Sequence, residues 1–76
     1  MKDLLEFLTK ALVEDPEAVQ VEELEEDGDL VFEITVADED LGRVIGKGGR
    51  VANAIRAISK AAAVRLERRV IVDILD

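Results

Sequence analysis

Three glycines lie within four consecutive positions of the chain, at Gly46, Gly48 and Gly49. Glycine loses more conformational freedom on folding than any other residue, so such a cluster marks a backbone path that other residues follow poorly. The sequence has apolar residues at helical spacing on both sides, in LGRVI before the cluster and in VANAIRAI after it. The chain is therefore expected to end one helix in a tight turn and to begin another directly afterwards.

An amphipathic helix is expected over residues 3–13, where leucines recur at helical spacing. Asp3 is its N-cap candidate. Asp15-Pro16 is expected to end it, because the residue before a proline is pushed out of the helical conformation. This helix either covers one side of a sheet or binds a partner.

Two strands are expected next, over residues 18–26 and 29–37. The Asp-Gly dipeptide at 27–28 between them is typical of a two-residue hairpin turn. The second strand alternates apolar and polar residues cleanly, whereas the acidic pair at 22–23 predicts a bulge or bend in the first. The acidic residues of 22–29 indicate a solvated edge strand and turn. Their charges would disfavour pairing with the edge of another sheet. A cation site is the alternative, but EF-hand spacing is lacking.

The second half begins with DED at 38–40, whose carboxylates are N-cap candidates for LGRVI. After the glycines, an apolar stripe predicts a helix of about four turns. Its members are Val51, Ile55, Ile58, Ala62 and Leu66. A last strand is expected over 68–75, parallel to the second strand because a helical crossover joins them. Residues 1–76 are thus expected to form one α+β domain of order α-β-β-α-α-β. Its three-stranded mixed sheet runs 18–26, 29–37, 68–75, with the helices packed on one face.

The composition favours a binding module over an enzyme. The chain has no Cys, His, Trp or Tyr, so the commonest general base, metal ligand and nucleophile are missing, and no cofactor or metal is expected. No apolar run approaches the roughly 20 residues of a membrane-spanning helix, and no cleavable leader opens the sequence, which predicts a soluble cytoplasmic protein. Residues 1–40 carry fifteen acidic residues and two lysines, whereas residues 41–76 carry eight basic and three acidic residues. A polyanion would therefore bind the second half, despite a net charge of −8.

Three interpretations of the GKGG segment compete. A P-loop requires Ser or Thr after the lysine, where this chain has Gly48, and a dinucleotide fingerprint requires Gly or Ala at Val51. A plain corner between two helices is possible, since such corners often contain glycine. A corner does not explain why Lys47 lies inside the turn and Arg43 and Arg50 flank it. The third interpretation is a grip on a phosphate backbone, in which glycines permit close approach and the next helix presents its N-terminus.

The segment LGRVIGKGGRVANAIRAI closely resembles the KH-domain consensus around its GXXG loop. The helix and strand that precede a β-α-α-β core resemble the type II arrangement of this domain. The chain length and the DEDLGRVIGKGG segment are similar to those of small stand-alone bacterial KH proteins, the YlqC or KhpA family. The resemblance implies cytoplasmic binding of single-stranded RNA and an RNA-chaperone role. It also implies pairing with a larger Jag-type KH-containing protein in the regulation of cell length and envelope synthesis.

The resemblance also implies a set of RNA-binding residues. These are Arg43, Val44, Ile45, Gly46, Lys47, Gly48, Gly49, Arg50 and Asn53. Arg43 and Arg50 are expected at the phosphates and Asn53 at a base edge, while Val44 and Ile45 divide between the core and the groove wall. Further basic residues, at positions 56, 60 and 65, lie on an exposed helix face and are either solvated or in contact with RNA. Because the basic half contains no aromatic residue for stacking, binding is expected to be weak and tolerant of sequence.

A second hypothesis is a protein-interaction subunit that dimerises through the alanine-rich helix and has little RNA affinity of its own. A stripe of small and apolar residues would allow two helices to approach closely. It consists of Ala54, Ala57, Ile58 and Ala61. A homodimer is expected on either hypothesis, with Ile58 or its neighbours partly exposed in the monomer.

Overall fold

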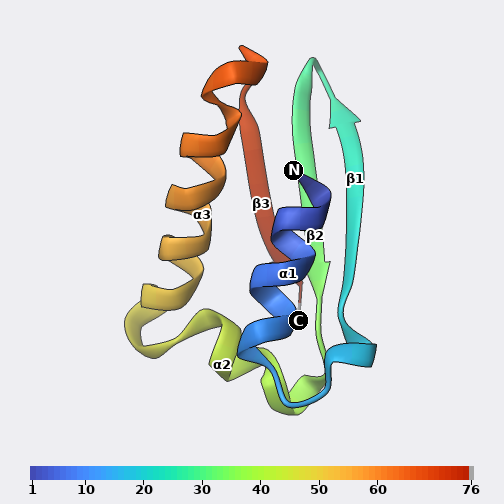
Figure 1. Cartoon of the computed structure of the whole chain (residues 1–76), viewed down its shortest axis with the longest axis vertical. Helices are drawn as coiled ribbons and strands as arrows, with labels where there is room; N and C mark the ends of the chain where they lie inside the picture. The colour runs from blue at the N-terminus through green and yellow to red at the C-terminus, as the bar shows by residue number, and fades with distance from the viewer. Residues whose placement is uncertain (76) are drawn as a thin grey trace.

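The order of the elements is the one that the sequence predicts. The computed structural model describes residues 1–75. Its helices and strands are α1 (Lys2–Leu12), β1 (Gln20–Glu26), β2 (Asp29–Thr35), α2 (Leu41–Ile45), α3 (Arg50–Ala63) and β3 (Val70–Leu75) (Figure 1). Short 3-10 turns occupy Pro16–Ala18, Asp38–Asp40, Lys47–Gly49 and Val64–Leu66. This α-β-β-α-α-β order confirms the α+β fold of a type II KH domain. None of the helices formed by residues 1–75 is long and apolar enough to cross a bilayer.

The three strands form one mixed sheet in the order β1-β2-β3, with β1 antiparallel and β3 parallel to β2, as predicted. Asp27 and Gly28 both have positive φ, 51° and 86°, as a two-residue hairpin turn requires. The bulge predicted at 22–23 is wrong, since the β1–β2 register continues unbroken through both residues. These glutamates lie on an edge strand, where they extend into solvent without disturbing the pairing. Within residues 1–75 no three acidic side chains are grouped so that they could hold a metal ion, so the cation-site alternative gains no support.

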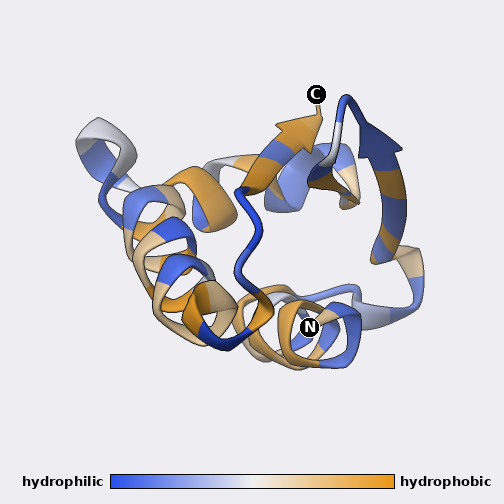
Figure 2. Ribbon diagram, turned by 90° about the horizontal axis from the view of Figure 1, so that it is seen from above, coloured by the Kyte–Doolittle hydropathy of each residue, from blue (hydrophilic) through white to orange (hydrophobic). Residues whose placement is uncertain are grey.

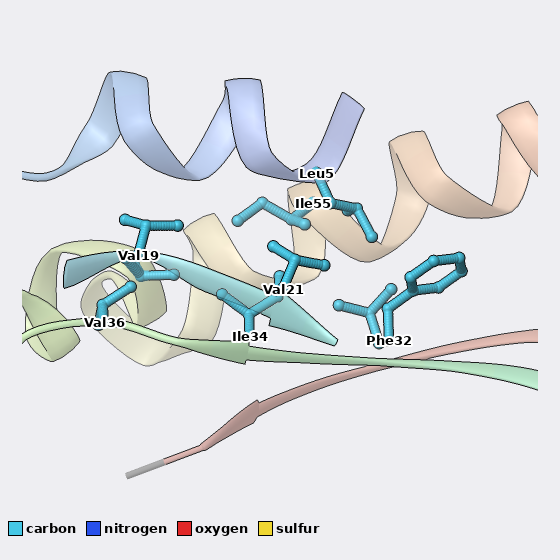
Figure 3. Close-up of a cluster of buried hydrophobic side chains, with 9 residues drawn as sticks. Leu5, Val19, Val21, Phe32, Ile34, Val36 and Ile55 are labelled. Carbon is cyan, nitrogen blue, oxygen red and sulfur yellow. The ribbon is translucent and has the colours of Figure 1, made fainter. Parts of the chain in front are cut away.

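The helices pack on one face of the sheet, which confirms the predicted layering. Seen from above, α1 and α3 lie side by side against the curved sheet (Figure 2). The hydrophobic core lies between these layers and draws on every helix and strand (Figure 3). Its buried members are Leu5, Val19, Val21, Phe32, Ile34, Val36, Val44, Ile55 and Val72.

The stripe of α3 that faces the sheet differs from the predicted one. Its buried residues are Ala52, Ile55, Ser59 and Ala63, so only Ile55 belongs to the predicted stripe. The Ser59 hydroxyl donates a 2.8 Å hydrogen bond to the Ile55 carbonyl, and Thr9 donates a similar 2.7 Å bond to Leu5 in α1. Since each buried hydroxyl is satisfied by its own helix, it can occupy the core at little cost. Ile58 is consequently turned outward and remains 45% exposed.

The ends of α1 also differ from prediction. Met1 rather than Asp3 occupies the N-cap position, and no side chain caps the helix. The helix ends at Leu12, before the predicted stop at Asp15-Pro16, and Pro16 begins a 3-10 turn. This end is one residue from that of the predicted range 3–13. The backbone N–H groups of residues 14 and 15, which follow the helix, are bound by a side chain from elsewhere in the chain.

That side chain is Asp40, which was expected to cap α2 but makes no such bond. Its carboxylate is 1% exposed and accepts two 3.0 Å hydrogen bonds, from the backbone N–H groups of Glu14 and Asp15. The Arg43 guanidinium lies 3.4 Å from the same carboxylate and 2.7 Å from that of Glu14. We call these four residues the Asp40 clasp. The clasp ties the segment after α1 to the start of α2.

Replacing Asp40 by Ala would leave the N–H groups of residues 14 and 15 without their acceptor. We expect the free energy of unfolding in urea to fall by about 1–3 kcal/mol, the cost of unsatisfied partly buried donors. The matched control is Asp38→Ala, two residues away, because Asp38 is exposed and makes no such contact. Equal stability of the two variants would show that the clasp does not hold the segment.

Candidate nucleic-acid interface

The glycine loop, Gly46–Gly49, joins α2 to α3 at one end of the molecule (Figure 1). Its three glycines all have positive φ, at 75°, 65° and 82°. Two backbone bonds fold it tightly, from Gly46 N to Gly42 O at 2.9 Å and from Gly49 N to Gly46 O at 3.1 Å. Because L-residues rarely adopt these angles, three of its four positions favour glycine.

The glycines differ in what surrounds them. A Cβ at Gly46 would lie 2.5 Å from Val51 Cγ2 and 2.8 Å from Val51 N, so glycine is required there for space as well as for φ. A Cβ at Gly48 would meet nothing within 4 Å. The Gly46 contact holds α3 against the end of α2, whereas the backbone at Gly48 is open to an approaching group.

The loop leads directly into the N-terminus of α3. Gly49 is the N-cap, and no side chain accepts a bond from the first N–H groups of this 14-residue helix. These donors and the positive end of the helix dipole attract anions. Lys47 and Arg50 lie on either side of Gly48-Gly49, are exposed, and form no ion pair within the described chain. The Arg50 N–H donates to the Lys47 carbonyl. The loop therefore combines open backbone at Gly48, a helix N-terminus without a side-chain cap and two cations that are free to bind a phosphate.

Two of the predicted site residues serve the fold instead. Val44 is fully buried in the core, which is one of the two places that the sequence left open for it. Arg43 belongs to the Asp40 clasp, where two carboxylates engage its charge. Ile45 is 38% exposed at the end of α2, beside the loop. Arg43 is thus placed to position the loop rather than to meet phosphate with a free charge.

Asn53 lies within the first turn of α3, where the structure brings it next to the loop. Its Nδ2 would lie 3.8 Å from a Cβ at Gly49. Its Oδ1 lies 3.5 Å from Arg56 Nη1, in a long hydrogen bond. The exposed Asn53 amide thus lies between the glycine loop and the surface that follows α3 away from the loop.

That surface is a groove between α3 and β3. β3 is an edge strand, paired only with β2, and the Arg56 Nε donates a 3.1 Å bond to the Val72 carbonyl at this edge. A hollow of about 280 Å³ lies here, which we call the α3–β3 groove. Its lining residues are Arg56, Lys60, Arg69, Val70, Ile71, Val72 and Asp73. Edge-strand N–H and C=O groups can pair with the polar edges of a base. Sequence analysis did not single out Arg69; the Arg-Arg pair directly before the last strand was the available signal.

A family model described as KhpA/KhpB, KH domain matches residues 2–74. Curated proteins named RNA-binding protein KhpA are similar over almost the whole chain. The one from Clostridium acetobutylicum is 51% identical over 75 residues, covering 99% of this chain and 100% of the relative. The one from Aquifex aeolicus is 40% identical, covering 100% and 96%, and the one from Chlamydia caviae is 38% identical, covering 100% and 97%. Together with the type II fold and its glycine loop, this similarity shows that the chain belongs to the KhpA/KhpB family of KH domains.

Proposed function

We propose that the protein binds single-stranded RNA by gripping its phosphate backbone with the glycine loop. The observation that carries the proposal is the open, positive-φ backbone at the N-terminus of α3, flanked by the unpaired cations of Lys47 and Arg50. The relatives that are named RNA-binding protein KhpA support the same function. The proposed contacts, from loop to helix, are Ile45, Gly46, Lys47, Gly48, Gly49, Arg50 and Asn53.

The α3–β3 groove favours a single strand over a duplex. Unpaired bases present polar edges that the β3 backbone and Asn53 can reach, whereas a duplex hides these edges. Neither phenylalanine can stack on a base in the groove, because Phe32 is buried and Phe7 lies on α1. Affinity therefore depends mainly on phosphate contacts, and we expect it to depend strongly on salt and little on sequence.

We extend the proposal, on the family resemblance, to the cellular role. The protein would act in the cytoplasm as an RNA chaperone, together with a larger Jag-type KH-containing partner. The pair would regulate cell length and envelope synthesis. RNA binding through the glycine loop is the part of this role that the chain can be tested for in isolation.

Replacing Lys47 and Gly48 by Asp tests the loop. Gly48 has space for a side chain and a φ of 65°, which Asp tolerates better than most residues, while Gly46 and Gly49 are kept. If the loop contacts about four phosphates, the wild-type slope of log K against log salt should be about −3. The double variant places two carboxylates at the phosphates and should lose most of its affinity in fluorescence anisotropy.

The control for this experiment is Lys10→Glu with Ala11→Glu, an exposed pair on α1 that changes the net charge by the same amount. It should keep its RNA affinity, and both variants should keep the wild-type circular dichroism spectrum. Unchanged affinity of a folded loop variant would mean that the glycines form only a corner between two helices. The protein-interaction hypothesis would then replace the proposal of RNA binding through the glycine loop.

A homodimer is the second candidate function, and the exposed side of α3 favours it. Its small and apolar residues are all exposed: Ala54, Ala57, Ile58 and Ala61. Ile58 is 45% exposed, as predicted for a residue that a second copy would cover. The residues of α3 that line the groove, Arg56 and Lys60, are not part of this stripe. Two linked sites would raise apparent affinity without a new contact.

Sedimentation at high micromolar concentration tests the dimer. The wild type should self-associate, and Ile58→Asp should shift it towards monomer, because a charge would be buried without a partner. Phe7→Asp is the matched control, since Phe7 is 70% exposed but lies on α1. A strictly monomeric wild type, or equal effects of the two substitutions, would contradict an interface on this stripe.

A further inference from the structure

A second hollow lies at the end of α3 that is far from the glycine loop. It has a volume of about 530 Å³. Its lining residues belong to the end of α3, to the start of β3 and to the turn between them, and Figure 1 shows the course of the chain there. We call it the far hollow. Its lining residues are Lys60, Ala63, Val64, Glu67, Arg68, Arg69 and Val70. The residues that line this hollow belong neither to the glycine loop nor to the stripe of small and apolar residues proposed for the dimer.

The far hollow is continuous with the α3–β3 groove. Lys60, Arg69 and Val70 line both. Along the helix, Lys60 lies ten residues beyond Arg50, a distance of about 15 Å at the α-helical rise. A single strand that leaves the glycine loop along the groove therefore arrives at Lys60 and Arg69.

The charges at this place are free to bind an anion. Within residues 1–75, neither Lys60 nor Arg69 forms an ion pair or a side-chain hydrogen bond. Arg68 is engaged elsewhere, with the Glu25 carboxylate at 3.2 Å and the Gly28 carbonyl at 3.0 Å. Asp73 in the groove and Glu67 in the far hollow are the opposing carboxylates. One lysine and one arginine that line both hollows thus remain without an ion pair at the end of the groove.

We propose that Lys60 and Arg69 form a second phosphate subsite, which extends the RNA footprint beyond the roughly four nucleotides that a GXXG loop holds. The inference rests on the proposed function and adds a length requirement to it. Lysine supplies a mobile point charge and arginine a planar fork, both suited to phosphate oxygens. The RNA continues past Arg56 along β3, and its distal phosphates reach the far hollow.

The test compares fluorescein-labelled, random-sequence RNA of four nucleotides with RNA of about ten nucleotides. Lys60→Ala with Arg69→Ala should leave binding of the short RNA unchanged. For the long RNA, the loss of two phosphate contacts should lower affinity about 25-fold at 0.1 M salt and reduce the salt slope by about 1.4. Circular dichroism should match the wild type, since both side chains are exposed.

Lys10→Ala with Arg65→Ala is the matched control, because it removes one lysine and one arginine that line neither hollow. It should bind both RNAs like the wild type. Unchanged binding of the long RNA by the Lys60 and Arg69 variant, or an equal loss for both lengths, would overturn the subsite and leave the proposed function standing. Failure of the wild type to bind either RNA would instead overturn the proposed function itself.

Discussion

The contact between Gly46 and Val51 is the constraint on which the candidate site depends. The absent side chain of Gly46 leaves room for the first turn of α3 to pack against the end of α2. This packing fixes the direction in which α3 leaves the loop and hence the direction of its N-terminus. The Asp40 clasp holds the other end of α2, through backbone N–H groups 25 and 26 residues away in sequence. A helix of five residues is too short to be stable alone, so the loop owes its geometry to these two anchors.

Two small polar side chains are buried in the helices that cover the sheet. Thr9 and Ser59 are fully buried at equivalent places on α1 and α3, each bonded to a carbonyl four residues earlier. Small buried side chains let both helices pack closely onto a three-stranded sheet. Larger apolar residues are turned outward instead, Phe7 on α1 and Ile58 on α3. A domain of this size buries a limited surface, and these two side chains therefore remain at the surface of the single chain.

Sequence alone predicted the element order, the strand order and the hairpin turn, because each depends on local patterns: period-two alternation, the Asp-Gly dipeptide and the glycine cluster. Prediction from sequence failed where a residue distant in the chain decides which groups a side chain contacts. Asp40 is a good N-cap by residue type, yet its carboxylate is bound by the segment after α1. Apolar spacing alone did not indicate that Ser59 is buried, because its hydroxyl is satisfied by the Ile55 carbonyl of its own helix. Of the predicted site, the loop, Arg50 and Asn53 are gathered in one place, while Val44 and Arg43 are used by the core and the clasp. Arg69 was missed because only the packing of β3 against α3 brings it next to Lys60.

The arrangement of charge explains how an acidic chain can offer a surface to a polyanion. The glutamates of β1 lie on one edge strand, while the groove lies along the other, at β3. Two strand spacings separate these edges by about 10 Å, which is close to the screening length at 0.1 M salt. Arg68 further reduces the field of the acidic edge by pairing with Glu25. The acidic edge therefore costs little affinity at cellular salt but disfavours any approach of RNA from the β1 side. In the proposed RNA complex, segregated charge of this kind would favour a strand that lies at the glycine loop and along α3, where Lys47, Arg50 and Lys60 are exposed.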